Sequence, residues 1–120
     1  MHEYKLTLDI IEIAEKNAFA AAGRSADAKV SKITLVIGES SGVSGESIKM
    51  YFDQISKGSV CEGAEIEIES VAPMLRCKTC SRLFRRKPFL FACTYKNCGG
   101  EGEPTEIGRE FYVKSIELRE

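Results

Sequence analysis

Four of the five cysteines form two close pairs whose residue types and spacing suit a metal site. Cys77 and Cys80 belong to the sequence CKTC, Cys93 and Cys98 belong to CTYKNC, and twelve residues separate the two pairs. Two cysteine hairpins at this spacing are the usual framework of a tetrahedral zinc site with four thiolate ligands. Thiolates favour zinc over magnesium or calcium, and four of them leave no open position for a catalytic water. We therefore expect a closed, structural zinc site.

The cationic side chains around these cysteines admit two interpretations. They can offset the negative charge of a zinc ion bound by four thiolates, or they can contact phosphates as in a nucleic-acid-binding zinc ribbon. We favour the first interpretation, because the whole chain has a formal net charge of −1. A redox dithiol at CKTC is a third interpretation, which the nearby second cysteine pair disfavours. The cations are Arg76, Lys78, Arg82, Arg85, Arg86, Lys87 and Lys96.

The amino terminus offers a second set of metal ligands. His2 is the only histidine of the chain, and a single terminal histidine is usually an incidental solvated residue. Removal of the first methionine requires a small second residue, so we expect Met1 to stay and to keep its free α-amine. Three nitrogens are then adjacent in the sequence. With the amide and imidazole nitrogens of His2, this amine can form fused chelate rings that suit tetragonal Ni(II) or Cu(II). The first N–H groups of a helix are unpaired, so the amide can lose its proton, and Glu3 can offset metal charge or orient a ligand.

Hydrophobic periodicity predicts two helices. Residues 3–22 have apolar side chains at helical spacing over a wide face, and Leu8 and Ile11 belong to that face. Residues 44–56 predict a second helix whose first serine suits the N-cap and whose Phe52 points inward. The fifth cysteine, Cys61, follows this helix, and we expect it to be a small buried hydrophobic side chain.

Three strands are predicted from alternating apolar and polar residues. Residues 30–37 and 64–70 alternate as half-buried strands, and residues 109–118 form a third strand whose alternation breaks near Ser115. The expected core residues of the helices and strands are Leu8, Ile11, Leu35, Ile37 and Phe52.

The order of these elements predicts the domain organisation. The last strand is too short to be a domain alone, so it must pair with the earlier strands, and the cysteine-rich segment is an insertion between two strands of one sheet. We expect an α+β fold, with two helices on a three-stranded sheet and an inserted four-cysteine, zinc-ribbon-like module. Residues 1–72 and 107–120 would form the α+β domain with the amino-terminal ligands, and residues 73–106 the zinc-binding module.

Composition restricts the class of protein. The chain has 120 residues, of which 43% are hydrophobic and 29% charged, as expected for a soluble protein with one core and a small satellite. The net charge selects neither nucleic acid nor an anionic membrane, and no apolar stretch is long enough to span a bilayer. The amino terminus lacks a signal-peptide core, so we expect a cytoplasmic protein. No Walker loop and no set of nucleophile, base and oxyanion donors is visible, so we expect no enzymatic activity.

The sequence also resembles a known family. MHE at the start, GSVCEGAEIEIE in the middle, the cysteine quartet and GREFYVKSIELRE at the end are similar to the HypA/HybF family of hydrogenase-maturation nickel metallochaperones. The likeness covers essentially the whole chain in the same order. The second cysteine pair has four intervening residues and no proline, whereas CPxC is common in that family. This difference alters the hairpin and leaves the number of ligands unchanged.

The resemblance implies a function and its sites. It implies nickel binding through Met1, His2 and Glu3, and delivery of nickel to the large subunit of [NiFe] hydrogenase together with a GTPase partner. Some members also serve urease. We therefore expect a nickel carrier, monomeric or homodimeric, that binds neither nucleic acid nor membrane; the rival functions are a zinc-ribbon nucleic-acid-binding adaptor and a structural zinc adaptor. The structural zinc ligands implied are Cys77, Cys80, Cys93 and Cys98.

Overall fold

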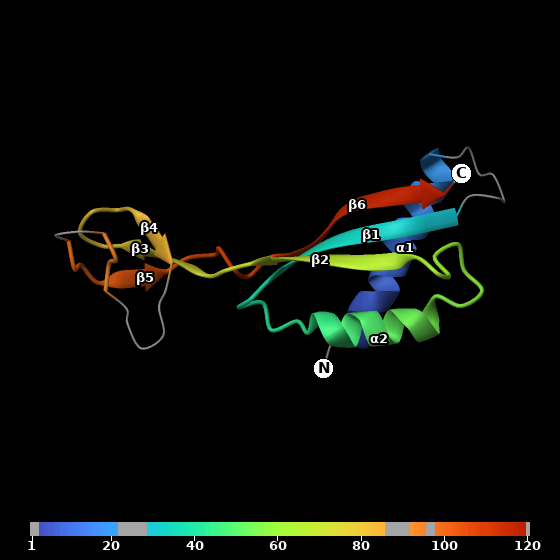
Figure 1. The fold of residues 1–120 in the computed structure, drawn as a ribbon, viewed down its shortest axis with the longest axis horizontal. Helices are drawn as coiled ribbons and strands as arrows, with labels where there is room; N and C mark the ends of the chain where they lie inside the picture. The colour runs from blue at the N-terminus through green and yellow to red at the C-terminus, as the bar shows by residue number, and fades with distance from the viewer. Residues whose placement is uncertain (1–2, 22–28, 86–91, 96–97, 120) are drawn as a thin grey trace.

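The computed structural model describes residues 3–21, 29–85, 92–95 and 98–119, and these residues form an elongated molecule of 60 × 28 × 16 Å. Two helices and a sheet lie at one end and a small β structure lies at the other (Figure 1). Among the described residues, no helix is long and apolar enough to cross a membrane. The elements in chain order are α1 (Glu3–Ala21), β1 (Lys29–Gly38), α2 (Gly45–Ile55), β2 (Glu65–Val71), β3 (Met74–Cys77), β4 (Leu83–Arg85), β5 (Gly102–Pro104) and β6 (Phe111–Arg119).

The larger sheet has the strand order β2-β1-β6, and with α1 and α2 it forms the helix–sheet domain. Strands β1 and β2 are parallel, so they need a crossover connection, which α2 supplies. Strand β6 pairs with β1 in the antiparallel direction. The segment that contains β3, β4 and β5, here called the cysteine module, leaves the sheet after β2 and returns into β6. The predicted α+β fold with an inserted module is therefore confirmed.

Strand β6 contains the irregularity that the sequence indicated near Ser115. In the register with β1, Ser115 pairs with Thr34 and Val113 pairs with Leu35, so Lys114 is an extra residue on β6. An extra residue of this kind is a β-bulge, and it shifts the alternation of side chains between the two faces by one position. The bulge is the physical cause of the break in the sequence pattern.

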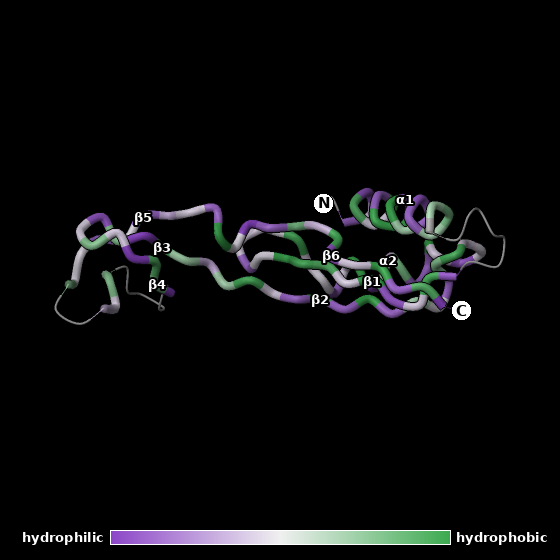
Figure 2. The backbone as a smooth tube through the Cα atoms, turned by 90° about the horizontal axis from the view of Figure 1, so that it is seen from above, coloured by the Kyte–Doolittle hydropathy of each residue, from purple (hydrophilic) through white to green (hydrophobic). Residues whose placement is uncertain are grey.

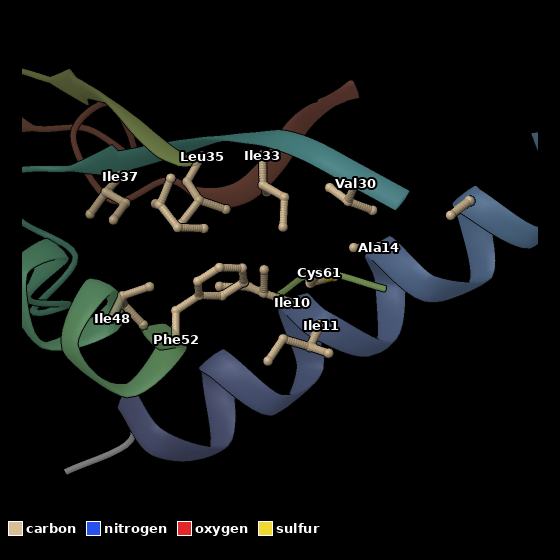
Figure 3. Close-up of a cluster of buried hydrophobic side chains, with 12 residues drawn as sticks. Ile10, Ile11, Ala14, Val30, Ile33, Leu35, Ile37, Ile48, Phe52 and Cys61 are labelled. Atoms are coloured by element: carbon tan, nitrogen blue, oxygen red, sulfur yellow. The ribbon is translucent and has the colours of Figure 1, made fainter. Parts of the chain in front are cut away.

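The main core lies between the sheet and the two helices (Figure 3). Ile33 and Leu35 of β1 and Phe52 of α2 are almost completely buried there, and Ile11 and Ile37 belong to the same cluster. Cys61 is also fully buried. Burial raises the pKa of its thiol to about 11, so it stays protonated at neutral pH. The prediction that Cys61 is a buried hydrophobic side chain is confirmed.

One predicted core residue was wrong. The side chain of Leu8 is 41% exposed, and Thr7 is fully buried in α1 instead. The hydroxyl of Thr7 donates a hydrogen bond of 2.6 Å to the carbonyl of Glu3, so the polar group can be buried without losing its partner. Because apolar residues of α1 lie on several sides of the helix, the sequence alone could not fix which side faces the core.

The face of the large sheet opposite the helices carries pairs of opposite charges. Lys32 forms a hydrogen-bonded ion pair with Glu67, which raises the pKa of the lysine and lowers that of the carboxyl group. Lys114 of β6 donates to both carboxylate oxygens of Glu69 on β2 at 3.0 Å, so this pair reaches across β1. Val36, which lies beside Glu69 in the register, is well buried even though it does not belong to the main core. The charged pairs therefore cover a face on which neither α1 nor α2 packs.

Two segments of chain connect the helix–sheet domain to the cysteine module (Figures 1 and 2). The loop after β1 holds both of them. The amide of Glu39 donates to the carbonyl of Val71 at 2.8 Å, and that of Ser40 donates to the carbonyl of Gly108 at 2.7 Å. A side chain at Gly38 would place its Cβ 2.0 Å from the carbonyl oxygen of Gly108, so the two backbones cross in contact. The expectation that the helix–sheet domain and the cysteine module are separate domains stays a prediction.

Candidate metal centre

A small antiparallel sheet with the order β4-β3-β5 positions the cysteines. Cys77 ends β3, and Cys80 lies in the turn that leads to β4. That turn is closed by hydrogen bonds from the amide of Cys77 to the carbonyl of Arg82 and from the amide of Ser81 to the carbonyl of Cys77, each 2.9 Å long. Cys93 belongs to the segment between β4 and β5, where its amide donates to the carbonyl of Gly100 at 2.7 Å. The two predicted cysteine pairs therefore lie close together in the module.

The four sulfur atoms form one cluster. The Sγ atoms of Cys77 and Cys98 are 3.5 Å apart, those of Cys80 and Cys93 are 3.8 Å apart, and all four lie within 4.8 Å of one another. These separations are too long for a disulfide bond, which measures about 2.05 Å. Four sulfurs each about 2.3 Å from a tetrahedral zinc ion would lie about 3.8 Å apart. The donor atoms thus fit a single tetrahedral metal ion.

Backbone amides prepare one of these sulfurs for metal binding. The N–H groups of Cys80 and Thr79 both donate to the Sγ atom of Cys77 at 3.4 Å. These hydrogen bonds, that from Cys80 foremost, stabilise the thiolate and lower the pKa of Cys77 to about 6. Burial has the opposite effect on Cys93 and raises its pKa to about 12. A divalent metal ion that binds here must therefore displace protons from the less acidic thiols.

The four-cysteine cluster leaves no room for a side chain at Gly100, a residue that the sequence patterns did not indicate. A Cβ atom at Gly100 would lie 2.6 Å from the Sγ atom of Cys77 and 2.6 Å from the hydroxyl of Thr79. Such contacts are far inside the van der Waals distance, so only glycine fits. The available signal was the Gly-Gly pair that directly follows Cys98.

The cations of the cysteine module make contacts within it. The guanidinium of Arg82 lies 4.8 Å from the centroid of the Tyr95 ring, and Arg76 donates to the carbonyl of Ser81 at 2.8 Å. Lys78 forms an exposed ion pair with a glutamate of the module at 3.7 Å. These contacts hold three of the cations against other groups of the module, and the interpretation that the cations offset thiolate charge stays a prediction. Three further cations lie outside the described residues: Arg86, Lys87 and Lys96.

The structure places one of the three predicted amino-terminal ligands, since Met1 and His2 lie outside the described residues. Glu3 is the first residue of α1, and its carboxylate accepts a hydrogen bond of 3.3 Å from the amide of Ser44. Ser44 is the N-cap of α2, as predicted, and its hydroxyl accepts a hydrogen bond from a backbone amide one turn later. The amino terminus of α1 is thus held beside the start of α2, a contact between distant residues that the sequence did not indicate.

Comparison with known proteins gives a consistent result over the whole chain. The family model described as "Hydrogenase/urease nickel incorporation, metallochaperone, hypA" matches residues 1–118. The hydrogenase maturation factor HypA of Caldanaerobacter subterraneus is 37% identical over 119 residues, which cover 98% of this chain and 99% of that protein. The protein of the same name from Geobacter sp. strain M21 is also 37% identical, with coverage of 98% and 99%.

Solved structures are similar as well. A solution structure of a HypA protein superposes with a TM-score of 0.69 at 26% identity, covering 99% of this chain and 97% of that chain. The solution structure of the Ni metallochaperone HypA from Helicobacter pylori superposes with a TM-score of 0.61 at 25% identity, covering 98% and 97%. The similarity thus includes the helix–sheet domain and the cysteine module together.

Proposed function

Because the chain belongs to the HypA family of hydrogenase/urease nickel-incorporation metallochaperones, we propose that it binds Ni(II) at its amino terminus and delivers it for maturation of [NiFe] hydrogenase, with urease as a further client. The observation that carries this proposal is the extent of the family match. It spans residues 1–118 and so includes both the amino-terminal ligands and the cysteine quartet.

The proposed nickel ligands are the first three residues. The α-amine of Met1 and the amide and imidazole nitrogens of His2 supply a nitrogen set of the kind that Ni(II) prefers. The position of Glu3 at the start of α1 supports this assignment, because the amide groups just before it need no helical partner. The hydrogen bond from Ser44 holds the Glu3 carboxylate at the start of α2, and the proposed nitrogen ligands directly precede Glu3 in the sequence.

The proposed role of the cysteine quartet is structural. Cys77, Cys80, Cys93 and Cys98 would hold one zinc ion, and their mutual distances suit its tetrahedral coordination. Four thiolates fill the coordination sphere, so this ion would stabilise the module rather than bind a substrate. The proposal has no enzymatic step in this chain. Nucleotide hydrolysis belongs to a GTPase partner, the acceptor is the hydrogenase large subunit, and the transfer takes place in the cytoplasm.

The experiment is a nickel titration of the protein with its native amino terminus. We expect His2→Ala to abolish stoichiometric Ni(II) binding without changing zinc content, because His2 supplies the only imidazole. An amino-terminal tag should have the same effect, because it converts the α-amine into an amide. Lys5→Ala is the matched control, since Lys5 is exposed on the first turn of α1 and supplies no proposed ligand.

Isothermal titration calorimetry measures nickel affinity and stoichiometry in all four proteins. Unchanged nickel affinity in both the His2→Ala and the tagged protein would contradict the proposed site. Absence of nickel binding by the wild-type protein would favour a purely structural zinc adaptor. A folded His2→Ala protein, recognised by an unchanged circular dichroism spectrum and full zinc content, separates loss of a ligand from loss of the fold.

A further inference from the structure

An aromatic contact ties the start of α1 to α2. The rings of Tyr4 and Tyr51 have centroids 5.5 Å apart and planes at 90°, which is an edge-to-face arrangement. Ring pairs with this geometry are attractive beyond the apolar surface that they bury. Tyr4 is 53% exposed, and Tyr51 is half-buried on α2. Tyr4 directly follows the three proposed nickel ligands in the sequence, so a residue of α2 contacts the residue next to them.

A second contact lies farther toward the beginning of α2. The Glu3 carboxylate accepts a hydrogen bond of 3.3 Å from the amide of Ser44, the N-cap residue of that helix. Ser44 and Tyr51 are seven positions apart in the sequence, which corresponds to about two helical turns, or about 10 Å along α2. The first turn of α1 is therefore held at two separate points of the same helix, and Figure 3 shows the two helices side by side.

The backbone of Glu3 is held from within α1 as well. The hydroxyl of Thr7 donates to the Glu3 carbonyl at 2.6 Å, and Thr7 is fully buried. Thr7 thus anchors the main chain of the first turn to the core, whereas the side chains of Glu3 and Tyr4 reach α2. Among these contacts, the ring pair is the one that a substitution on α2 can remove without changing a proposed ligand, a helix cap or the core.

The charge of the proposed cargo makes the position of Glu3 important. A helix carries partial positive charge at its amino terminus, and α1 and α2 begin beside each other. A divalent nickel ion bound by Met1 and His2 would lie at that electrically unfavourable end, and Glu3 supplies the acidic group of the first turn of α1. The attraction between this carboxylate and the metal weakens with distance and with screening by solvent. Chain termini are poorly ordered unless contacts tie them down.

We propose that Tyr51 is a positioning residue for the proposed nickel site. Its ring holds Tyr4, and through it the first turn of α1, so that the Glu3 carboxylate stays where it offsets the charge of bound nickel. Without the ring, Tyr4 loses this partner, the first turn becomes less ordered, and the carboxylate spends part of its time away from the metal. This role rests on the proposed nickel function and adds to it a residue of α2 that supplies none of the proposed ligands.

Nickel titration calorimetry on the whole chain with its native amino terminus tests this role. Tyr51→Ala should weaken Ni(II) affinity by about tenfold, the upper range that an edge-to-face ring pair can supply. Tyr51→Phe should bind like the wild type, because it keeps the ring. Met50→Ala is the matched control, since Met50 is the neighbouring residue on α2 and is 53% exposed. Zinc content and the circular dichroism spectrum should stay the same in every variant.

A double-mutant cycle determines whether Tyr51 acts through Glu3. Glu3→Gln keeps the shape of the side chain and removes its charge. If the ring matters because it holds this carboxylate, Tyr51→Ala should weaken nickel affinity by less than about twofold once Glu3→Gln is present, since the two changes share one mechanism. Fully additive losses would overturn the proposal. Tyr51→Leu, which removes the ring but keeps a large apolar side chain, replaces Tyr51→Ala if that protein does not fold.

The outcomes separate this role from the nickel site itself. If His2→Ala abolishes nickel binding while Tyr51→Ala binds like the wild type, the site stands and the role of Tyr51 is wrong. A lower melting temperature of Tyr51→Ala with unchanged nickel affinity would indicate a purely structural contact and would likewise overturn the role. So would a Tyr51→Phe protein that binds nickel as weakly as Tyr51→Ala, because the ring would then not be the cause. Unchanged affinity in both the His2→Ala and the tagged protein would overturn the site and the role together.

Discussion

At Gly100 the backbone passes so close to the cysteine cluster that a single methyl group would collide with a sulfur. We expect Gly100→Ala to lower zinc affinity roughly 10–100-fold, as is typical when a group that supports a metal ligand is disturbed. The reason is the 2.6 Å distance from the added Cβ atom to the Sγ atom of Cys77. Competition for zinc against a chromophoric chelator measures the change.

The neighbouring glycine provides the control for this substitution. Gly99 has a φ of +64°, and a Cβ atom there meets nothing within 4 Å. Gly99→Ala would therefore cost about 1 kcal/mol for the left-handed backbone but leave the sulfur undisturbed. If Gly99→Ala lowered zinc affinity as much as Gly100→Ala, then backbone strain, and not crowding of Cys77, would govern the site.

The amino-terminal ligands predict a steep pH dependence of nickel binding. We expect affinity to fall as the pH decreases from about 8 to about 6, where the α-amine (pKa about 7.7–8.0) and a histidine (pKa about 6.5) take up protons. Deprotonation of the His2 amide by the metal adds a further proton to the exchange, so protons and nickel compete for the same nitrogens. Titration in small pH steps, with zinc content followed in parallel, tests this. A flat affinity would point to carboxylate ligands, which are already deprotonated over this pH range.

The residues of the two proposed metal sites were predictable to different degrees. The cysteine quartet is visible in the sequence because each pair is local and its spacing has a geometric meaning. The contact between Glu3 and Ser44 joins residues 41 positions apart, so no local pattern could indicate it. Gly100 was missed for the same reason, since its importance depends on the position of Cys77 in space.

Among the elements, length determined which ones the sequence could predict. The predicted bounds of α1, β1, α2, β2 and β6 lie within one or two residues of the observed ones, because each element is long enough to show its periodicity. Strands β3, β4 and β5 have only three or four residues, too few for an alternating pattern. The parallel pairing of β1 with β2 was also not predicted, since strand direction depends on the path of α2.

The cysteine module should depend on metal for its fold. Among the described residues, its buried cluster contains the apolar residues Leu75 and Phe84 and otherwise only cysteines that are proposed zinc ligands. We expect zinc removal, or Cys77→Ser, to disorder residues 74–105 while most of the helix–sheet domain stays folded. Structural zinc contributes about 10–16 kcal/mol in small zinc-binding peptides, far more than this apolar cluster can supply. Hydrogen exchange on the zinc-free protein is the measurement. Loss of protection throughout α1 and β1 on zinc removal would contradict a separable module.

For the molecule as a whole, the crossing of Gly38 and Gly108 should fix the direction of the cysteine module. Gly38→Ala would drive a Cβ atom into the carbonyl of Gly108 at 2.0 Å, and a backbone atom cannot move aside easily. We expect the hydrogen bond between Ser40 and Gly108 to break and the module to tumble more independently. Backbone ¹⁵N relaxation measured separately for the two parts detects this motion.

A glycine away from the crossing serves as the comparison. Gly63 has a φ of +79°, and a Cβ atom added there would meet nothing within 4 Å. Gly63→Ala should lower the melting temperature slightly without changing the relative tumbling of the two parts. If Gly38→Ala left the tumbling unchanged as well, the crossing would not be what orients the module.

The insertion of the cysteine module between β2 and β6 also affects the order of folding. Once β2 has paired with β1, strand β6 must find β1 across the 39 residues between Val71 and Phe111, and closing a loop costs more entropy as it lengthens. A metal bridge from Cys77 to Cys98 removes about half of that length from the search, which lowers the entropic barrier by about 0.6 kcal/mol. Zinc bound far from the large sheet would thus speed the final closure of that sheet, so that metal supply during synthesis influences how quickly the chain reaches its native state.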